Sequence, residues 1–383
     1  MIGQYIIDLL KKHEKFNYYF NIKILNYRFI IEENNKENFE KIQSLFEEYI
    51  HPSIDISAPK FEYKVKNIQN AEVVSKLYEL RKEFGEPKRI QTFKDDTYHE
   101  EYSLFNGEIM IFFPEECNEY LIIVHNDKFY FICRENMNSY LLRIIREIYL
   151  RNNENYGNVS FHGGAFSICK NGVMVCGDKA KGKTTVILEQ LKKGSSYLAN
   201  DRVIISQKEK EYFINYLPLS MRIGMGTISR LSCITNIINK YPWSRKQSKK
   251  VLNYAYDMGV SSNEFGGAEK LEITSKEISD IFKVNLIESI SLDAIVFPDI
   301  DPNFSGIEII PCSSQEALQL MMQQCMTPLD ENWISPWLFP RNKSDSDLED
   351  YAYKFTLEML KKVRSYKIHF GFDAYCNWDM KIF

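Results

Sequence analysis

The chain of 383 residues carries 48 basic and 52 acidic residues, which gives a formal net charge of −4. This near balance argues against a general nucleic-acid-binding protein and against a membrane-surface protein. Hydrophobic residues make up 44% of the chain, a share that is normal for globular proteins and excludes global disorder. The length suits one large domain or two ordinary ones.

Cysteine usage and the N-terminus indicate the cellular compartment. The eight cysteines include no C-x-x-C pair, so neither a zinc site nor a disulfide framework is expected, and reduced thiols fit the cytoplasm. Residues 1–20 lack the apolar core of a signal peptide. No apolar run approaches the roughly 18 residues of a membrane span. We therefore expect a cytoplasmic protein with no membrane partner.

The first 155 residues show mixed helix and strand patterns. A strand is expected over Ile22 to Ile31, and a hairpin at Asn106-Gly107, because Asn-Gly supplies the positive φ angles of a type I′ turn. A second strand pair surrounds Asn126-Asp127. An apolar stripe over residues 141–149 predicts a helix, and the polar run 151–155 is typical of a linker. Residues 1–155 are thus predicted to form an α+β accessory domain.

From Val159 onward, short apolar strands alternate with helices. Residues 172–176 form a buried-strand pattern, and a helix is expected over 184–193, closed by Gly194. Ser313-x-x-Glu316 predicts a capping box at the start of a helix. Further segments complete the predicted nucleotide-binding domain, 156–383: strands over 197–199, 203–205 and 294–297, and a closing helix over 347–364.

The motif G-x-x-x-x-G-K-[ST] runs from Gly177 to Thr184, between that strand and that helix. Glycines let successive backbone N–H groups curl around a phosphate, and the helix N-terminus adds its dipole. Lys183 can reach the β and γ phosphates, and the Thr184 hydroxyl can bind Mg²⁺. The alternative is a chance Gly/Lys turn. The predicted nucleotide-binding residues are Gly177, Asp178, Lys179, Ala180, Lys181, Gly182, Lys183, Thr184 and Thr185.

The surroundings of this loop resemble the HPr kinase family, whose catalytic domain is related to phosphoenolpyruvate carboxykinase. The resemblance covers residues 159–206. It consists of a His162-Gly163-Gly164 element, a loop that opens with Gly177-Asp178, and the stretch Asn200-Asp201-Arg202-Val203, where the family has Asp-Asp-Arg-Val. Residues 222–228 resemble the family's G-x-G segment. The resemblance implies an α/β kinase domain that uses ATP and Mg²⁺.

Two departures from the family pattern bear on chemistry. Asn200 replaces the first Asp of the pair, and residues 221–223 lack the acidic residue that precedes the G-x-G segment. The family can both phosphorylate a serine and remove the phosphate. The loss of one carboxylate puts the reverse reaction in doubt for this chain.

The resemblance also implies roles for individual residues. Asp201 is the candidate base or metal ligand, with Thr184 as the second metal ligand; the alternative for Asp201 is a turn or cap residue. His162 is a candidate for steering the proton or holding the Asp201 carboxylate, against a structural role beside a glycine turn. Asn200 could bind Mg²⁺ or orient the substrate. Arg222 and Lys270 are further candidates for phosphate or substrate contacts.

A basic run of Lys240, Arg245, Lys246, Lys249 and Lys250 could hold an acidic peptide, or form a solvated loop.

The reaction expected from the resemblance is transfer of the γ-phosphoryl group of ATP to a Ser or Thr hydroxyl of a peptide or protein, as in kinases that tailor ribosomally made peptides. A small-molecule hydroxyl kinase, or a nucleotide-binding regulatory protein without catalysis, are the alternatives. The predicted partner is the acceptor, and no nucleic acid is expected. Because HPr kinases are hexamers, the resemblance also implies contacts between copies of the chain.

Overall fold

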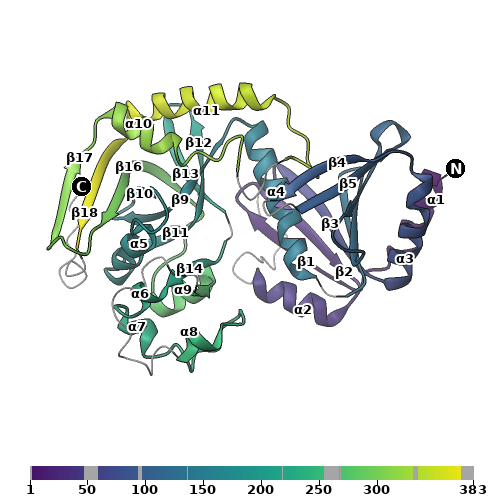
Figure 1. The fold of residues 1–383 in the computed structure, drawn as a ribbon, viewed down its shortest axis with the longest axis horizontal. Helices are drawn as coiled ribbons and strands as arrows, with labels where there is room; N and C mark the ends of the chain where they lie inside the picture. Colours follow the sequence, from purple (N-terminus) through teal and green to yellow (C-terminus); the bar gives the residue numbers. More distant parts are fainter. Residues whose placement is uncertain are drawn as a thin grey trace. The chain divides into compact units, whose positions relative to one another are not determined.

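The computed structural model describes residues 2–46, 59–93, 97–135, 137–217, 219–253, 267, 269–330 and 335–371. These residues form a mixed α/β structure with two eight-stranded sheets and a two-stranded ribbon (Figure 1), which confirms the predicted α/β class. The chain divides into two compact units. One contains Met1–Asn152 and Leu329–Asn342, and the other contains Asn153–Pro328 and Lys343–Phe383. The recognition role predicted for residues 1–155 stays a prediction.

The first unit is built on a sheet with the strand order β1-β2-β3-β8-β7-β6-β5-β4. Apolar side chains of two helices, α1 (Ile2–His13) and α3 (Ala71–Leu80), pack on one face of it. On the other face lies α4 (Asn138–Asn155), where Tyr149 meets Tyr27 edge to face at 4.8 Å. The remaining elements are β1 (Tyr18–Ile24), β2 (Tyr27–Glu33), α2 (Lys36–Leu45), β3 (Phe61–Gln69), η2 (Arg81–Glu83), β4 (Lys88–Phe93), β5 (Thr97–Leu104), η3 (Phe105–Gly107), β6 (Ile109–Pro114), β7 (Tyr120–His125) and β8 (Lys128–Cys133).

The turns of this sheet decide three of the predictions. The predicted strand 22–31 is wrong as one element, because Leu25 adopts a φ of 54° and the chain reverses between β1 and β2. The hairpin at Asn106-Gly107 is confirmed, but its loop is longer than the two residues of a type I′ turn, since Leu104 pairs with Ile109. The pair around Asn126-Asp127 is confirmed, with both residues at positive φ.

The predicted linker 151–155 is wrong, since these polar residues form the end of helix α4. Arg151 is 1% exposed, and its guanidinium pairs with Glu147 one turn earlier, at 3.2 Å. Asn152 donates a hydrogen bond to the Tyr63 hydroxyl on β3. These partners offset part of the cost of burying the polar side chains, so a polar segment that looks like a linker can continue a buried helix.

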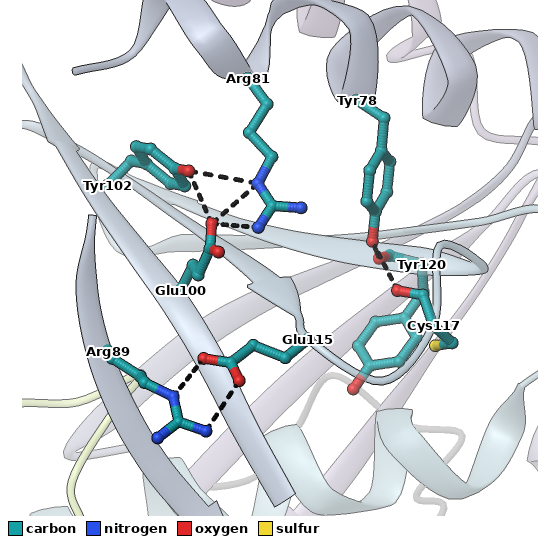
Figure 2. A network of polar contacts seen from close by, with 8 residues as sticks. All are labelled: Tyr78, Arg81, Arg89, Glu100, Tyr102, Glu115, Cys117 and Tyr120. Atoms are coloured by element: carbon teal, nitrogen blue, oxygen red, sulfur yellow. Dashed lines mark hydrogen bonds and ion pairs between the residues drawn. The ribbon is translucent and has the colours of Figure 1, made fainter. Parts of the chain in front are cut away.

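A polar network ties helix α3 and its extension to the sheet (Figure 2). The Tyr78 hydroxyl donates to the backbone oxygens of Cys117 and Tyr120 at 3.1 and 3.0 Å. Arg81 donates to Glu100 at 2.8 Å, and that carboxylate also accepts from Tyr102. Arg89 on β4 and Glu115, directly after β6, form a bidentate ion pair at 2.6 and 2.9 Å (Figure 2). The bonds of Tyr78 and Arg81 hold the helix and its extension on the sheet.

The second unit is built on a sheet with the order β10-β9-β12-β13-β16-β18-β17, in which β11 also pairs with β9 and β10 also pairs with β16. Three strands, β10 (Asn171–Cys176), β16 (Ser289–Ile300) and β18 (Arg364–Phe370), run parallel and end at the same edge. The other strands are β9 (Val159–Ile168), β11 (Ser196–Ala199), β12 (Arg202–Lys208), β13 (Glu211–Tyr216) and β17 (Ile307–Pro311), and the separate ribbon is β14 (Met221–Gly224) with β15 (Lys270–Ile273).

The helices of the second unit are α5 (Lys183–Lys192), α6 (Met225–Ile228), α7 (Ser232–Thr235), α8 (Lys249–Asn253), α9 (Ser275–Phe282), α10 (Ser314–Met322) and α11 (Asp345–Leu360). The strand and helix on either side of the phosphate loop are confirmed, with Gly194 at a φ of 86° after α5. Ser313 caps α10 as predicted. The Glu316 carboxylate, which would complete a capping box, instead accepts hydrogen bonds from Lys367 and Cys312. The closing helix ends at Leu360, and Arg364 already begins β18. None of the described helices is long and apolar enough to cross a membrane.

Candidate nucleotide-binding site

The predicted phosphate loop leaves the carboxyl end of β10 and leads into α5, in the centre of the second unit (Figure 1). Helix α5 packs through Val186, Ile187 and Leu191 into a core shared with Val175 on β10 and Val296 on β16. This burial fixes the helix axis relative to the parallel strands. The loop therefore lies where ligands bind in parallel α/β sheets, outside the carboxyl ends of the strands.

Backbone donors gather along the loop. Among the described residues, no acceptor faces the amide N–H groups of Lys179, Ala180, Gly182, Lys183 and Thr184. Successive unpaired amides at a helix N-terminus form a concavity of positive partial charge that suits a phosphate. The donor set of this loop therefore fits the phosphates of a nucleotide.

The Lys183 ammonium lies within the curl of the loop. It donates to the backbone oxygens of Gly177 at 2.6 Å and Asp178 at 2.9 Å. Burial lowers the pKa of Lys183, and the nearby carboxylates of Asp201 and Asp178 oppose this effect. The Lys183 amine thus lies at the place where phosphate oxygens would enter the loop.

Gly182 closes the loop and begins the helix. Its φ of 100° lies in the left-handed region, which favours glycine. A Cβ at this position would also lie 2.6 Å from the Phe370 ring at the end of β18. The second glycine of the motif is therefore required both by the turn and by the close packing of the loop on β18.

The Asn200-Asp201 pair stands opposite the two glycines of β9. Ala199 pairs with Ala165 and Arg202 pairs with His162, so the ladder is interrupted between them. Asp201 adopts a φ of 75°, and its backbone oxygen accepts from the Gly163 N–H at 3.1 Å.

Gly164 makes room for this interruption. A Cβ on Gly164 would lie 2.8 Å from the Ala199 oxygen and would collide with the Ile187 side chain. The predicted His-Gly-Gly element is thus brought together with Asp201. Its second glycine is required because a larger side chain would not fit there.

Asp201 lies among positive groups. One carboxylate oxygen is 3.6 Å from Nε2 of His162, and the other accepts from Arg202 at 3.1 Å. Its side chain is 48% exposed. Loss of water contact alone would raise the pKa of Asp201, but the His162 contact and the charges of Arg202 and Lys183 lower it to about 2. Asp201 is therefore a carboxylate anion at neutral pH.

Three oxygen donors for a hard cation come from the predicted residues. The Thr184 hydroxyl donates to the Asn200 side-chain oxygen at 3.4 Å, and the Asp201 carboxylate follows directly in the chain. Mg²⁺ usually binds one or two protein oxygens and completes its shell with phosphates and waters. The residues present fit this pattern, although no cluster of three or more His, Cys, Asp or Glu occurs among the described residues.

Two other predicted loop residues have protein partners. Lys181 pairs with Asp299 at the end of β16, at 2.7 Å, and that aspartate also lies 3.3 Å from His369. The Thr185 hydroxyl is 3.3 Å from that of Thr227 in α6. Thr185 thus fixes α5 to the segment that resembles the G-x-G signature.

Arg222 and Lys270 lie on the β14–β15 ribbon, where Arg222 faces Glu272 and Gly224 faces Lys270. Burial lowers the pKa of Lys270, the charges of Arg222 and Lys179 lower it further, and Asp201 has the opposite effect. The ribbon thus adds positive charge near the loop.

In the predicted basic run, Arg245 pairs with Glu272 at 3.2 Å. Residues 254–266, which follow the run, lie outside the described residues.

Sequence reasoning missed Gln324. Its side-chain amide donates to the Asp178 carboxylate at 2.8 Å, and its backbone oxygen accepts from the His162 N–H at 2.8 Å. It lies after α10, far along the chain from the loop, and no motif marks it.

Substituting Gly164 tests the steric reasoning about the interrupted ladder. Gly164→Ala is expected to lower the free energy of unfolding by about 1–3 kcal/mol, as overpacking does, and to reduce nucleotide turnover because Asn200 and Asp201 are displaced. Gly194→Ala separates backbone strain from collision, because Gly194 has a φ of 86° but no atom within 4 Å of an added Cβ, whereas Gly164 meets the collision without such a φ. Denaturant titration and turnover assays on both variants decide. Equal turnover of Gly164→Ala and the parent chain would contradict the role of Gly164.

Comparison with the sequence profiles of known families finds no match. Comparison with curated protein sequences finds no match either. Comparison with solved structures finds a likeness to the HPr(Ser) kinase/phosphatase from Coxiella burnetii, with 11% identity, a TM-score of 0.24, and coverage of 55% of this chain and 85% of that chain. This likeness is too weak to carry an argument about fold or function. The site is therefore interpreted from its own residues.

Proposed function

We propose that this protein is an ATP-dependent kinase that transfers the γ-phosphoryl group to a hydroxyl group. One observation carries the proposal: the loop amides and the Lys183 ammonium converge beside Thr184, Asn200 and the Asp201 carboxylate. Phosphoryl transfer needs positioned phosphates, a cation and a group that orients the acceptor hydroxyl, and little covalent chemistry. This site offers a residue for each of these needs.

Each residue has a role in the proposed transfer. The loop amides and Lys183 bind the β and γ phosphates and neutralise the charge that builds up on them. Thr184 and Asp201, with the Asn200 amide oxygen, would hold Mg²⁺. When bound, Mg²⁺ screens the phosphate charge and fixes its orientation.

Asp201 orients the acceptor hydroxyl, and His162 holds Asp201. The hydroxyl oxygen forms a bond to the γ phosphorus, the bond from that phosphorus to the β–γ bridging oxygen breaks, ADP leaves, and the hydroxyl proton passes to Asp201. With a pKa of about 2, Asp201 is a weak base. The proton is therefore expected to move late, after most of the P–O bond change, as loose transition states of this reaction allow.

We propose a Ser or Thr of a peptide or protein as the acceptor, including the precursor of a ribosomally made peptide. The support is the resemblance of residues 159–206 to the HPr kinase family, which phosphorylates a serine, together with a separate first unit that has no part in the phosphate loop. That unit is free to recognise the acceptor.

A second candidate function is nucleotide binding without catalysis, and one observation favours it. Asn200 stands where the family has a carboxylate, so one fewer anion is available for a metal ion or a proton. Lys183, Thr184 and Asp201 are retained, which favours catalysis.

The test is incubation of the full chain with γ-labelled ATP, Mg²⁺ and a panel of acceptors: Ser- and Thr-containing peptides encoded by neighbouring reading frames, free serine, and sugars. Label on a peptide Ser or Thr, located by mass spectrometry and absent with Lys183→Ala, is the expected result. Label on serine or a sugar alone would replace the peptide acceptor by a small molecule. Tight ATP binding with no transfer to any acceptor would favour the regulatory function.

A further inference from the structure

We propose that Gln324 is a positioning residue for the phosphate loop, which it joins to the strand that carries His162. The inference rests on the proposed nucleotide site and adds to it a residue outside every motif in the sequence. Gln324 follows helix α10 and is 7% exposed. Both ends of this residue make hydrogen bonds to opposite sides of the site.

The side chain of Gln324 acts on the loop. Its Nε2 donates to a carboxylate oxygen of Asp178 at 2.8 Å, and the backbone oxygen of Asp178 in turn accepts from the Lys183 ammonium at 2.9 Å. A hydrogen bond to a charged acceptor is roughly twice as strong as a neutral one. Gln324 therefore holds the second residue of the loop, and through it the loop backbone that Lys183 contacts.

The main chain of Gln324 acts on β9. Its oxygen accepts from the His162 N–H at 2.8 Å, and the next residue, Cys325, forms an isolated antiparallel bridge with Phe161. The following residues add two bonds to Ser160, whose oxygen accepts from the Met326 N–H at 2.8 Å and whose N–H donates to the Thr327 hydroxyl at 3.0 Å. The segment 324–327 is thus held along β9. This fixes the backbone position from which the Gln324 side chain reaches Asp178.

The charge of Asp178 explains why this restraint matters. A carboxylate at the entrance of a phosphate loop repels the phosphates unless it is turned away from them, and Coulomb repulsion is strong at short range. The amide of Gln324 faces one oxygen of that carboxylate and sets its direction. The loop can then present its N–H groups, and not this anion, to the nucleotide.

Two substitutions at Gln324 separate the hydrogen bond from packing. Gln324→Met keeps the length and loses the donor, so nucleotide Kd and KM are expected to rise about tenfold while kcat changes by less than about threefold. Gln324→Glu places a second carboxylate against Asp178, and a larger loss of affinity is expected. The matched control is Gln323→Glu, because Gln323 is the exposed neighbour. It should leave Kd, KM and kcat unchanged.

A double variant supplies the decisive measurement. Gln324→Glu combined with Asp178→Asn reverses donor and acceptor, so that an amide at 178 can donate to a carboxylate at 324. Nucleotide affinity is expected to recover to within about threefold of the parent chain. A role in packing alone predicts no such recovery, because both side chains keep their size in every one of these variants.

Calorimetry with ATP and Mg²⁺ on the full chain distinguishes the outcomes. If Lys183→Ala loses nucleotide affinity while Gln324→Met and Gln324→Glu keep it, the positioning role is wrong and the nucleotide site stands. If both single variants lose affinity and the double variant does not recover it, the hydrogen bond between Gln324 and Asp178 is not what positions the loop, and the inference is overturned as well. If the parent chain binds no nucleotide, the proposed function fails, and this inference fails with it.

Discussion

Lys183→Ala is expected to weaken ATP–Mg²⁺ binding by about a hundredfold and to abolish turnover, because it removes the ammonium that donates to the backbone of the loop. The magnitude corresponds to the loss of hydrogen bonds from a charged donor, about 1.5–3 kcal/mol. The variant also loses the two bonds to Gly177 and Asp178 that hold the loop. Calorimetry measures the affinity, and circular dichroism checks that the fold is intact.

The control for this experiment is Lys193→Ala, since Lys193 is an exposed lysine at the other end of the same helix. It should bind ATP like the parent chain. Unchanged affinity and turnover in Lys183→Ala, in a folded protein, would remove the basis for placing the nucleotide at this loop.

Asp201→Asn is expected to lower kcat by about 10²–10⁴-fold with a much smaller change in nucleotide affinity. The substitution keeps the size of the side chain but removes the charge that His162 and Arg202 face. The expected factor is that of a lost acid–base group. Single-turnover assays separate the transfer step from binding. Because the pKa of Asp201 is about 2, its ionisation should not limit phosphoryl transfer by the parent chain anywhere between about pH 5 and 8.

Two further variants are needed to interpret the Asp201→Asn result. Asp280→Asn removes an exposed carboxylate of α9 and should leave kcat unchanged. Asn200→Asp introduces the carboxylate that the HPr kinase family has at the corresponding place and should be tolerated better than Asp201→Asn. If it introduces removal of phosphate from the product, the missing carboxylate is what limits the reverse reaction. Near-normal transfer by Asp201→Asn would mean that the catalytic centre is placed wrongly or that the protein only binds nucleotide.

The phosphate loop could be predicted from the sequence because its requirements are local. A strand, a turn with Gly182 in the left-handed region and a helix are all encoded within a short run, and so is their spacing. The Asn126-Asp127 hairpin was predictable for the same reason. The position of Asp201 beside His162 came from the resemblance, and the structure adds the steric role of Gly164 between them.

Features that depend on distant partners could not be predicted. The run 151–155 is polar, yet Glu147 and Tyr63 supply the bonds that bury it within α4. A pattern along the chain cannot show such partners. Gln324 is the same case at the site, since its function depends on Asp178, and nothing in the residues around Gln324 signals that contact.

The return of Leu329–Asn342 to the first unit also has a consequence for biosynthesis. The Trp337 ring packs on His99 at 4.8 Å between centroids, its backbone N–H donates to Glu147, and Phe339 meets Tyr63 edge to face. These groups leave the ribosome only after the whole phosphate loop has been made. The N-terminal unit therefore cannot complete its core first, as vectorial folding would otherwise allow. The apolar surface that Trp337 and Phe339 cover therefore stays partly exposed until most of the second unit has been translated.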